Sequence, residues 1–256
     1  MCKAGDVVGA LARAVDQSGL TAFELDFFLH GVRKRRLLQK SWDVRFETVE
    51  PVRSFSWRKY GRGFAGWYYS VTVRDHVGYE SWLERDRLVL LDRDPQVTAI
   101  ASQPFWLHWH DGVRKRRHAP DYFVRLADGR ARVVDVRAED DLDDDTRESF
   151  SATENACRAV GWDFDWAGRP DPVFMANVRW LARYRRTRCG LPQAVADRLL
   201  DVFREPTGLW EGAGSVGDRL QVLPVLFHLL WSGALETDLV GDLMQTDSLV
   251  WTEGSR

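Results

Sequence analysis

The sequence has few of the residues that would place it in a specialised class of protein. Its three cysteines, Cys2, Cys157 and Cys189, are widely spaced, which argues against a disulfide framework or a cysteine metal cluster and favours reduced thiols. No apolar run approaches the ~20 residues that cross a bilayer, and the first residues carry no hydrophobic signal core. We therefore expect a cytoplasmic protein with no membrane partner.

Long polar or biased tracts are also scarce. Hydrophobic residues make up 45% and charged residues 29% of 256 positions, which is typical of a globular protein that can bury one large core or two modest ones. The charge is uneven, with 22 Lys/Arg against 13 Asp/Glu over 30–137 and 4 against 10 over 189–256. A basic first half suits a polyanionic partner, although both halves could simply be solvated surfaces.

Hydrophobic periodicity and turn residues divide the chain into three predicted regions. Residues 1–52 read as an N-terminal helical arm, with a helix from Val7 to Leu38. Residues 53–168 alternate strands and helices, which indicates a mixed sheet flanked by helices. The Gly- and Pro-containing segment at 168–172 marks the boundary to a mainly helical region, 169–256. Two short β-like runs near its end are compatible with a winged-helix-like module.

Within the middle region the predicted elements follow one another closely. We expect a helix from about Tyr79 to Leu91, stopped by Pro95. The following runs alternate with period two and predict strands, and a polar helix and one more strand come next. The predicted strands are Val97–Ile100, Phe105–Trp109, Tyr122–Leu126, Arg132–Val136 and Trp162–Trp166, and the helix is Asp143–Val160.

Three carboxylates stand in apolar surroundings in this region. Glu84 shares a helical stripe with Leu88 and Leu91. Asp121 immediately precedes one predicted strand, and Asp135 lies near the end of the next. Unpaired carboxylates in such places are costly, so each of them serves either a buried salt bridge or a functional site.

The turn between the two strands decides whether the aspartates can meet. A two-residue turn at Asp128-Gly129 would put Asp121 and Asp135 on opposite faces of the sheet. A three-residue loop with Gly129 in the left-handed conformation would pair them directly. We predict the three-residue loop, because it also groups Tyr122, Val124, Leu126, Val134 and Val136 on the other face, as expected of a packed side. Two or three carboxylates form the ligand set of a hard cation such as Mg²⁺, with Mn²⁺ as the alternative. Such an ion supports phosphodiester hydrolysis.

The order Glu84, Pro120-Asp121 and Asp135-Val136-Arg137 resembles the PD-(D/E)XK nuclease motif. The neighbouring motifs are Ser81-Trp82-Leu83-Glu84, Asp94-Pro95-Gln96-Val97, Gln103-Pro104 and Arg116-Arg117-His118-Ala119-Pro120-Asp121. Together they resemble the TnsA-like endonuclease subunits of heteromeric transposases over roughly 53–137. The resemblance implies a restriction-endonuclease-like α/β fold with metal carboxylates at Glu84 and Asp121, and with Asp135 in the more variable third-ligand position.

The same resemblance implies a function and partners. The expected activity is Mg²⁺-dependent hydrolysis of the 5′ strand at transposon ends in double-stranded DNA. The implied partners are a DDE-type transposase subunit and an AAA+ ATPase regulator, which the C-terminal region would contact. Arg137 departs from the family pattern, which has lysine there. Arginine stays protonated but can stabilise anionic oxygen. Arg137 can therefore serve if the role is electrostatic, whereas the enzyme is impaired or inactive if a neutral amine is required.

Several basic residues are candidates for contact with DNA phosphates. Those directly before Asp121 are favoured, and a second group lies in a Gly- and aromatic-rich stretch; the candidates are Arg114, Lys115, Arg116, Arg117, Arg58, Lys59 and Arg62. Two other readings stay open from the sequence. The chain could be a nuclease-fold scaffold that binds DNA or a transposase without cutting, or a stand-alone restriction-type endonuclease.

Overall fold

The computed structural model describes residues 23–41, 44–55 and 64–252. The chain forms two compact units. The first unit comprises 1–66, 78–80 and 98–167, and the second comprises 67–77, 81–97 and 168–256. No helix of the described residues has both the length and the apolar character that a membrane span requires.

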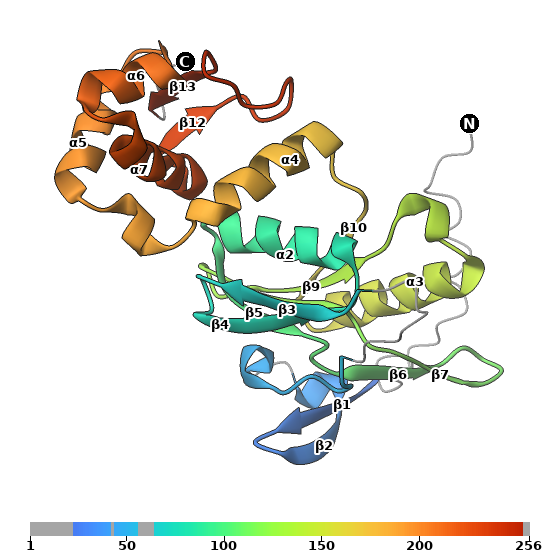
Figure 1. Cartoon of the computed structure of the whole chain (residues 1–256). Coiled ribbons are helices and arrows are strands. Elements are labelled where there is room, and N and C mark those ends of the chain that lie inside the picture. Colours follow the sequence, from blue (N-terminus) through green and yellow to red (C-terminus); the bar gives the residue numbers. More distant parts are fainter. Residues whose placement is uncertain (1–22, 42–43, 56–63, 253–256) are drawn as a thin grey trace. The chain divides into compact units, whose positions relative to one another are not determined.

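The first unit contains two four-stranded sheets (Figure 1). Sheet A has the strand order β2-β1-β6-β7 and is antiparallel throughout. Sheet B has the order β10-β9-β8-β5. The strands of sheet A are β1 (Glu24–Leu29), β2 (Val32–Leu37), β6 (Trp106–His110) and β7 (Lys115–His118). Those of sheet B are β5 (Val97–Ser102), β8 (Tyr122–Leu126), β9 (Ala131–Val136) and β10 (Asp163–Ala167).

Sheet B confirms the predicted alternation of strands and helices. β8 and β9 are antiparallel, whereas β9 and β10 are parallel and are joined through the helix α3 (Asp144–Ala159). Asp143 caps α3 by accepting a hydrogen bond from the Thr146 backbone at 2.8 Å. Gly161, with φ of +75°, follows the helix and lets the chain turn into β10. The result is the mixed α/β fold that the sequence predicts.

An aromatic core lies between sheet A, sheet B and α3. Phe46, on the short helix η3 (Phe46–Thr48), is fully buried, and its ring centroid lies 5.0–5.5 Å from those of Phe27, Phe105, Phe123 and Trp162. Leu107 and Trp109 of sheet A and Val133 of sheet B belong to the same cluster. Full burial of side chains of this size contributes about 1.5–3 kcal/mol each, so this cluster fixes how the two sheets pack.

The β8–β9 loop has the predicted form. Tyr122 pairs with Val134 and Arg125 with Ala131, and the loop Ala127-Asp128-Gly129 is closed by a hydrogen bond from Leu126 N to Arg130 O at 2.9 Å. Gly129 has φ of +87°, a conformation that glycine adopts without strain. This register places Asp121 directly opposite Asp135, as the three-residue loop requires.

The predicted helix from Val7 to Leu38 is wrong where the structure describes it. Residues 24–37 form the hairpin β1–β2, with His30 and Gly31 both at positive φ in the turn. The sequence of β1 alternates between Leu25 and Phe27, buried in the core, and more polar neighbours. On its other edge the backbone of β1 pairs with β6. Pairing with a strand distant in the sequence therefore overrides the helical pattern. Residues 1–22 lie outside the described part of the chain.

The second unit begins with the hairpin of β3 (Gly66–Ser70) and β4 (Asp75–Tyr79), followed by α2 (Trp82–Arg93). The buried Asp92 at the end of α2 accepts hydrogen bonds from the backbone N–H groups of Val71 and Thr72 at 3.1 and 2.9 Å. Asp86, also buried, accepts a hydrogen bond from Arg179 Nε at 2.9 Å. Buried, hydrogen-bonded carboxylates of this kind fix α2 within the unit.

The rest of the second unit is mainly helical. The helices are α4 (Pro172–Leu181), α5 (Gln193–Val202), α6 (Leu209–Val216) and α7 (Arg219–Ser232). Of these, α6 was not predicted. The predicted terminal β-runs form β12 (Leu235–Thr237) and β13 (Leu249–Thr252), with β11 (Thr207–Gly208) on the other side of β13. The remaining short helices are η2 (Leu38–Lys40), η4 (Glu139–Asp141), η5 (Ala182–Tyr184) and η6 (Thr187–Gly190).

Candidate active site

The two aspartates of the β8–β9 hairpin lie side by side at one end of sheet B. Asp121 accepts a hydrogen bond at Oδ2 from the Val136 backbone N–H at 2.7 Å. The Asp121 backbone N–H in turn lies 3.3 Å from Asp135 Oδ1. Asp135 is 1% exposed, and both side chains share a face with Phe123 and Val133 of the aromatic core. The hairpin therefore holds two carboxylates close together at the boundary of a buried core.

His118 is a further member of this site. It lies at the end of β7, and its Nε2 is 2.9 Å from each carboxylate oxygen of Asp135. The imidazole therefore fixes the orientation of the Asp135 carboxylate. No sequence pattern indicates this contact, since His118 and Asp135 belong to strands of different sheets. Only the packing of sheet A against sheet B reveals it.

Glu84 lies on α2, in the second unit. It is 9% exposed, and the predicted neighbours on its stripe, Leu88 and Leu91, are buried. Its Oε1 accepts a hydrogen bond from Ser81 Oγ at 2.8 Å. The Glu84 backbone N–H donates a hydrogen bond to Ser81 Oγ at 3.1 Å. Glu84 thus contributes to the N-cap of α2. The motif Ser81-Trp82-Leu83-Glu84 has the serine and the glutamate at the spacing that this cap requires.

Arg137 follows β9 directly, and its backbone continues the sheet through a hydrogen bond from its N–H to Ala167 O at 3.0 Å. Its exposed side chain turns toward the acidic segment before α3, where Nε lies 3.4 Å from Asp141 O. The Arg137 charge also helps to hold the pKa of Asp143 below its usual value, after the hydrogen bonds from Thr146. In this arrangement the Arg137 side chain interacts with the 141–143 segment.

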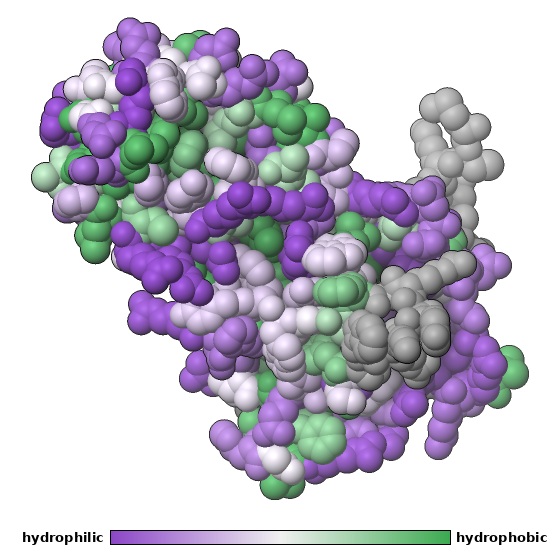
Figure 2. Space-filling view, in the orientation of Figure 1, coloured by the Kyte–Doolittle hydropathy of each residue, from purple (hydrophilic) through white to green (hydrophobic). Residues whose placement is uncertain are grey.

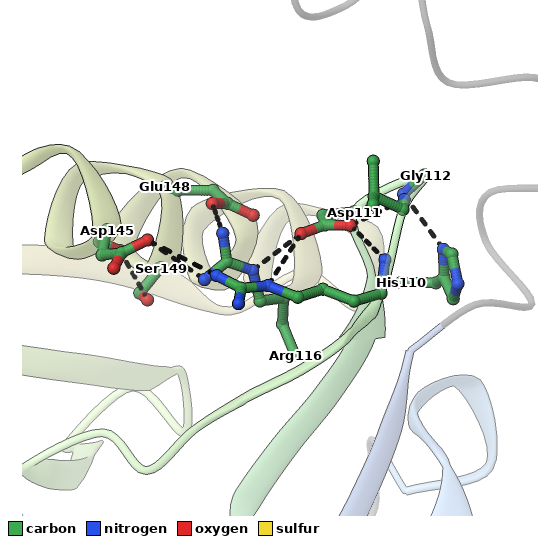
Figure 3. Close-up of polar contacts among 9 residues, drawn as sticks. His110, Asp111, Gly112, Arg116, Asp145, Glu148 and Ser149 are labelled. Carbon is green, nitrogen blue, oxygen red and sulfur yellow. Dashed lines mark hydrogen bonds and ion pairs between the residues drawn. The ribbon is translucent and has the colours of Figure 1, made fainter.

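The basic residues before Asp121 differ from one another in their surroundings. Arg116 is enclosed by carboxylates: its Nε lies 2.7 Å from Asp111, and its NH groups lie 3.1 Å from Asp145 and 2.6 Å from Glu148 (Figure 3). The hydrogen bonds from Arg114 N, Arg116 and Val113 N lower the pKa of Asp111. The Arg116 charge is therefore neutralised inside the protein.

Other predicted DNA contacts remain exposed or fall outside the described residues. Arg114 is 3.9 Å from Asp111 and 4.0 Å from Asp145, at the margin of ion-pair distance. Lys115 and Arg117 are exposed, and the Arg117 guanidinium lies 4.4 Å from the centroid of the Trp106 ring. Arg58, Lys59 and Arg62 lie outside the described part of the chain.

Two carboxylates are an adequate protein contribution to a magnesium site. Among the described residues no group of three His, Cys, Asp or Glu side chains is arranged to hold a metal ion. Mg²⁺ keeps several of its waters and commonly binds proteins through only one or two carboxylates. The Asp121–Asp135 pair can meet that requirement because the two residues stand opposite each other in the hairpin and carboxylate oxygens are hard ligands.

Part of the chain is similar to a known protein family. Residues 94–167 match the family described as TnsA-like endonuclease N terminal. This range begins before β5 and ends with β10, so it spans sheet B, α3 and both aspartates. No curated protein matches the chain. Over residues 94–167 the chain is therefore similar to the N-terminal domain of TnsA-like endonucleases.

Proposed function

We propose that the protein is the metal-dependent endonuclease subunit of a heteromeric transposase and hydrolyses the 5′ strand at transposon ends. The observation that carries the proposal is the β8–β9 register, which sets Asp121 opposite Asp135 within the region of family similarity. Sheet A supplies His118 to the same pair. A paired aspartate site with an imidazole, in an endonuclease fold, is suited to phosphodiester hydrolysis.

The residues would divide the work as follows. Asp121 and Asp135 would hold Mg²⁺, with Mn²⁺ as a substitute. When bound, the ion supplies a polarised phosphoryl oxygen and an activated water. His118 keeps the Asp135 carboxylate in one orientation, since both oxygens lie 2.9 Å from its Nε2. The Val136 N–H does the same for Asp121.

Arg137 would act through its charge. An arginine remains protonated and so stabilises anionic oxygen rather than accepting a proton. Its side chain would have to leave Asp141 O to reach the phosphate. Arg137→Lys should therefore raise the cleavage rate if an amine at this position is required, and leave it unchanged if a fixed positive charge suffices.

The second unit is proposed to bind the partner subunits, a DDE-type transposase and an AAA+ regulator. It carries a groove of about 430 Å³ whose lining includes Trp180, Trp210 and Leu220, which are 41%, 43% and 82% exposed. Hydrophobic residues reach the surface of this unit among polar ones (Figure 2). Exposed apolar surface of this kind is typical of protein–protein contacts.

Reconstitution with a DDE-type transposase subunit and an AAA+ ATPase regulator tests the proposal. Asp121→Ala should abolish 5′-strand cleavage, whereas 3′-strand cutting by the partner persists. Mn²⁺ binding to the isolated protein, measured by calorimetry, should weaken in parallel. Asp128→Asn, which changes an exposed aspartate in the same hairpin, is the matched control and should retain both properties.

Two outcomes would favour the other functions. If the Asp121→Ala complex excises DNA as well as wild type, the protein is a scaffold and another subunit cuts both strands. If the purified protein cuts DNA at full rate without partners, it is a stand-alone restriction-type endonuclease.

A further inference from the structure

The strand β7 presents its basic side chains to two different environments. Successive side chains of a strand point to opposite faces of the sheet. Arg116 pairs with Trp109, which is buried in the core, and reaches Asp145 and Glu148 of α3. Lys115 and Arg117 therefore point to the opposite face, away from α3. The basic run before Asp121 is thus divided into a neutralised inner residue and two exposed outer residues.

The outer face of sheet A can be followed from its strand register. Arg117 pairs with His108, which pairs with Glu24. Lys115 pairs with His110, Trp106 with Asp26, and Asp26 with Arg35. Arg33 reaches the same face, because its guanidinium contacts Asp26. The inner face carries Leu25, Phe27, Leu107 and Trp109 of the core. We use "outer face" for Arg33, Arg35, Trp106, His108, His110, Lys115 and Arg117 with Glu24 and Asp26.

The outer face has an excess of exposed positive charge. Glu24 and Asp26 are paired with Arg35 and Arg33, which remain 53% and 65% exposed. Lys115 and Arg117 form no ion pair with the described residues, so two cations are left without a counter-charge. Burial lowers the pKa of His108, so its ring is neutral at neutral pH. Arg117 is held over Trp106 at 4.4 Å, which reduces the entropy that it would lose on binding.

The dimensions of this face suit a DNA duplex. Adjacent strands are about 4.8 Å apart, so β2 and β7 are separated by about 14 Å across the sheet. The major groove of B-DNA is about 12 Å wide. Cations on the two outermost strands can therefore reach phosphates on both sides of the groove. Asp121 lies four positions after Arg117, a span of at most about 14 Å, so DNA on this face would lie within reach of the aspartate pair.

We propose that the outer face of sheet A binds the phosphate backbone of duplex DNA, with Lys115 and Arg117 as its principal contacts and Arg33 and Arg35 as flanking ones. The inference rests on the proposed function, because it names the surface that holds the substrate of that site. It assigns no phosphate contact to Arg116, whose three carboxylate partners occupy its donors.

Duplex binding at several salt concentrations tests the assignment. The full-length protein is titrated into a fluorescent duplex in EDTA, which prevents cleavage, and anisotropy gives the association constant. Each phosphate contact contributes about 0.9 to the slope of log K against log salt. The variant K115Q/R117Q should bind more weakly and should lower the slope by about 1.8. R117K keeps the charge and should keep the slope.

A matched variant separates this surface from general electrostatics. R130Q/R158Q removes the same charge from two exposed arginines of the first unit, 58% and 63% exposed, and should leave the slope unchanged. Equal slopes for wild type and K115Q/R117Q would overturn the proposed surface while leaving the proposed function intact. The proposed surface would also be overturned if K115Q/R117Q bound single-stranded DNA more weakly but bound the duplex as well as wild type. Failure of the wild type to bind duplex at low salt would instead contradict the proposed function itself.

Discussion

The two hairpins of the first unit, β1–β2 and β8–β9, are built on different turns and differ in how far their strands are exposed to solvent. β1–β2 turns through His30 and Gly31, both at positive φ, as two-residue hairpin turns require. β8–β9 uses three residues, with Gly129 alone at positive φ. β2 is largely exposed, whereas β8 and β9 are buried on both faces.

This difference shows what fixes each register. In β8–β9, shifting the pairing by one residue would move Phe123 and Val133 out of the aromatic core, so the register is determined by burial on both sides. In β1–β2, only β1 contributes to that core, through Leu25 and Phe27. The register of β1–β2 therefore depends more on its turn and on the cross-strand ion pairs that Asp26 and Glu24 form with arginines. The buried hairpin holds the aspartate pair, and the exposed one presents charge.

The largest difference in unfolding free energy should appear when one side chain in each hairpin is truncated to alanine. Phe123, in β8, is fully buried, and Phe123→Ala should cost about 3–5 kcal/mol of unfolding free energy through lost burial and a cavity. Val32, in β2, is 51% exposed, and Val32→Ala should change stability by no more than about 0.5 kcal/mol. Urea unfolding followed by circular dichroism measures both. Similar losses in the two variants would contradict the contrast.

The turn glycines give a smaller and more selective effect. Gly129→Ala and Gly31→Ala each place a side chain at positive φ, +87° and +72°, and each should cost about 1–2 kcal/mol. Only Gly129→Ala should also weaken Mn²⁺ binding, because it strains the hairpin that aligns Asp121 with Asp135. Calorimetry on both variants measures this; equal Mn²⁺ affinities would show that the loop does not control the pair.

The smallest effect concerns the pH dependence of the exposed hairpin. The hydrogen bond from Arg33, against the opposing effect of burial, holds the pKa of Asp26 below its usual value of 3.8. A depressed carboxyl pKa contributes stability that is present above the usual pKa and is lost as the pH falls through the folded-state pKa. Asp26→Asn should therefore lower the urea midpoint at neutral pH. The difference from wild type should shrink below about pH 3.8; a constant difference would exclude the linkage.

Sequence patterns predicted sheet B and its helix well, because their apolar residues are periodic and their turns contain Asp-Gly and Gly. They also predicted the facing of Asp121 and Asp135, which follows from a local loop. The β1–β2 hairpin was missed since β1 gains its stability from β6, about 80 residues away in the sequence. β7 was missed as a strand because its four residues, Lys115–His118, are all polar.

The contacts of single polar side chains were the least predictable part of the site. His118 meets Asp135 only through the packing of two sheets. The enclosure of Arg116 depends on α3, whose residues Asp145 and Glu148 lie about 30 positions later. A run of basic residues in a sequence does not show which of them will be neutralised, because strand alternation and a distant helix decide it.

The interleaving of the two units has a consequence for synthesis on the ribosome. Residues 67–97 emerge before the roughly 70 residues that complete the first unit, yet Asp86 pairs with Arg179 and the Arg185 guanidinium contacts Tyr69 O. At about 5–20 residues per second, α2 waits at least about 4 s for the first of these partners. During that interval the strands β5 to β10 of the first unit are still emerging, so α2 stays exposed to non-native contacts until Arg179 is synthesised.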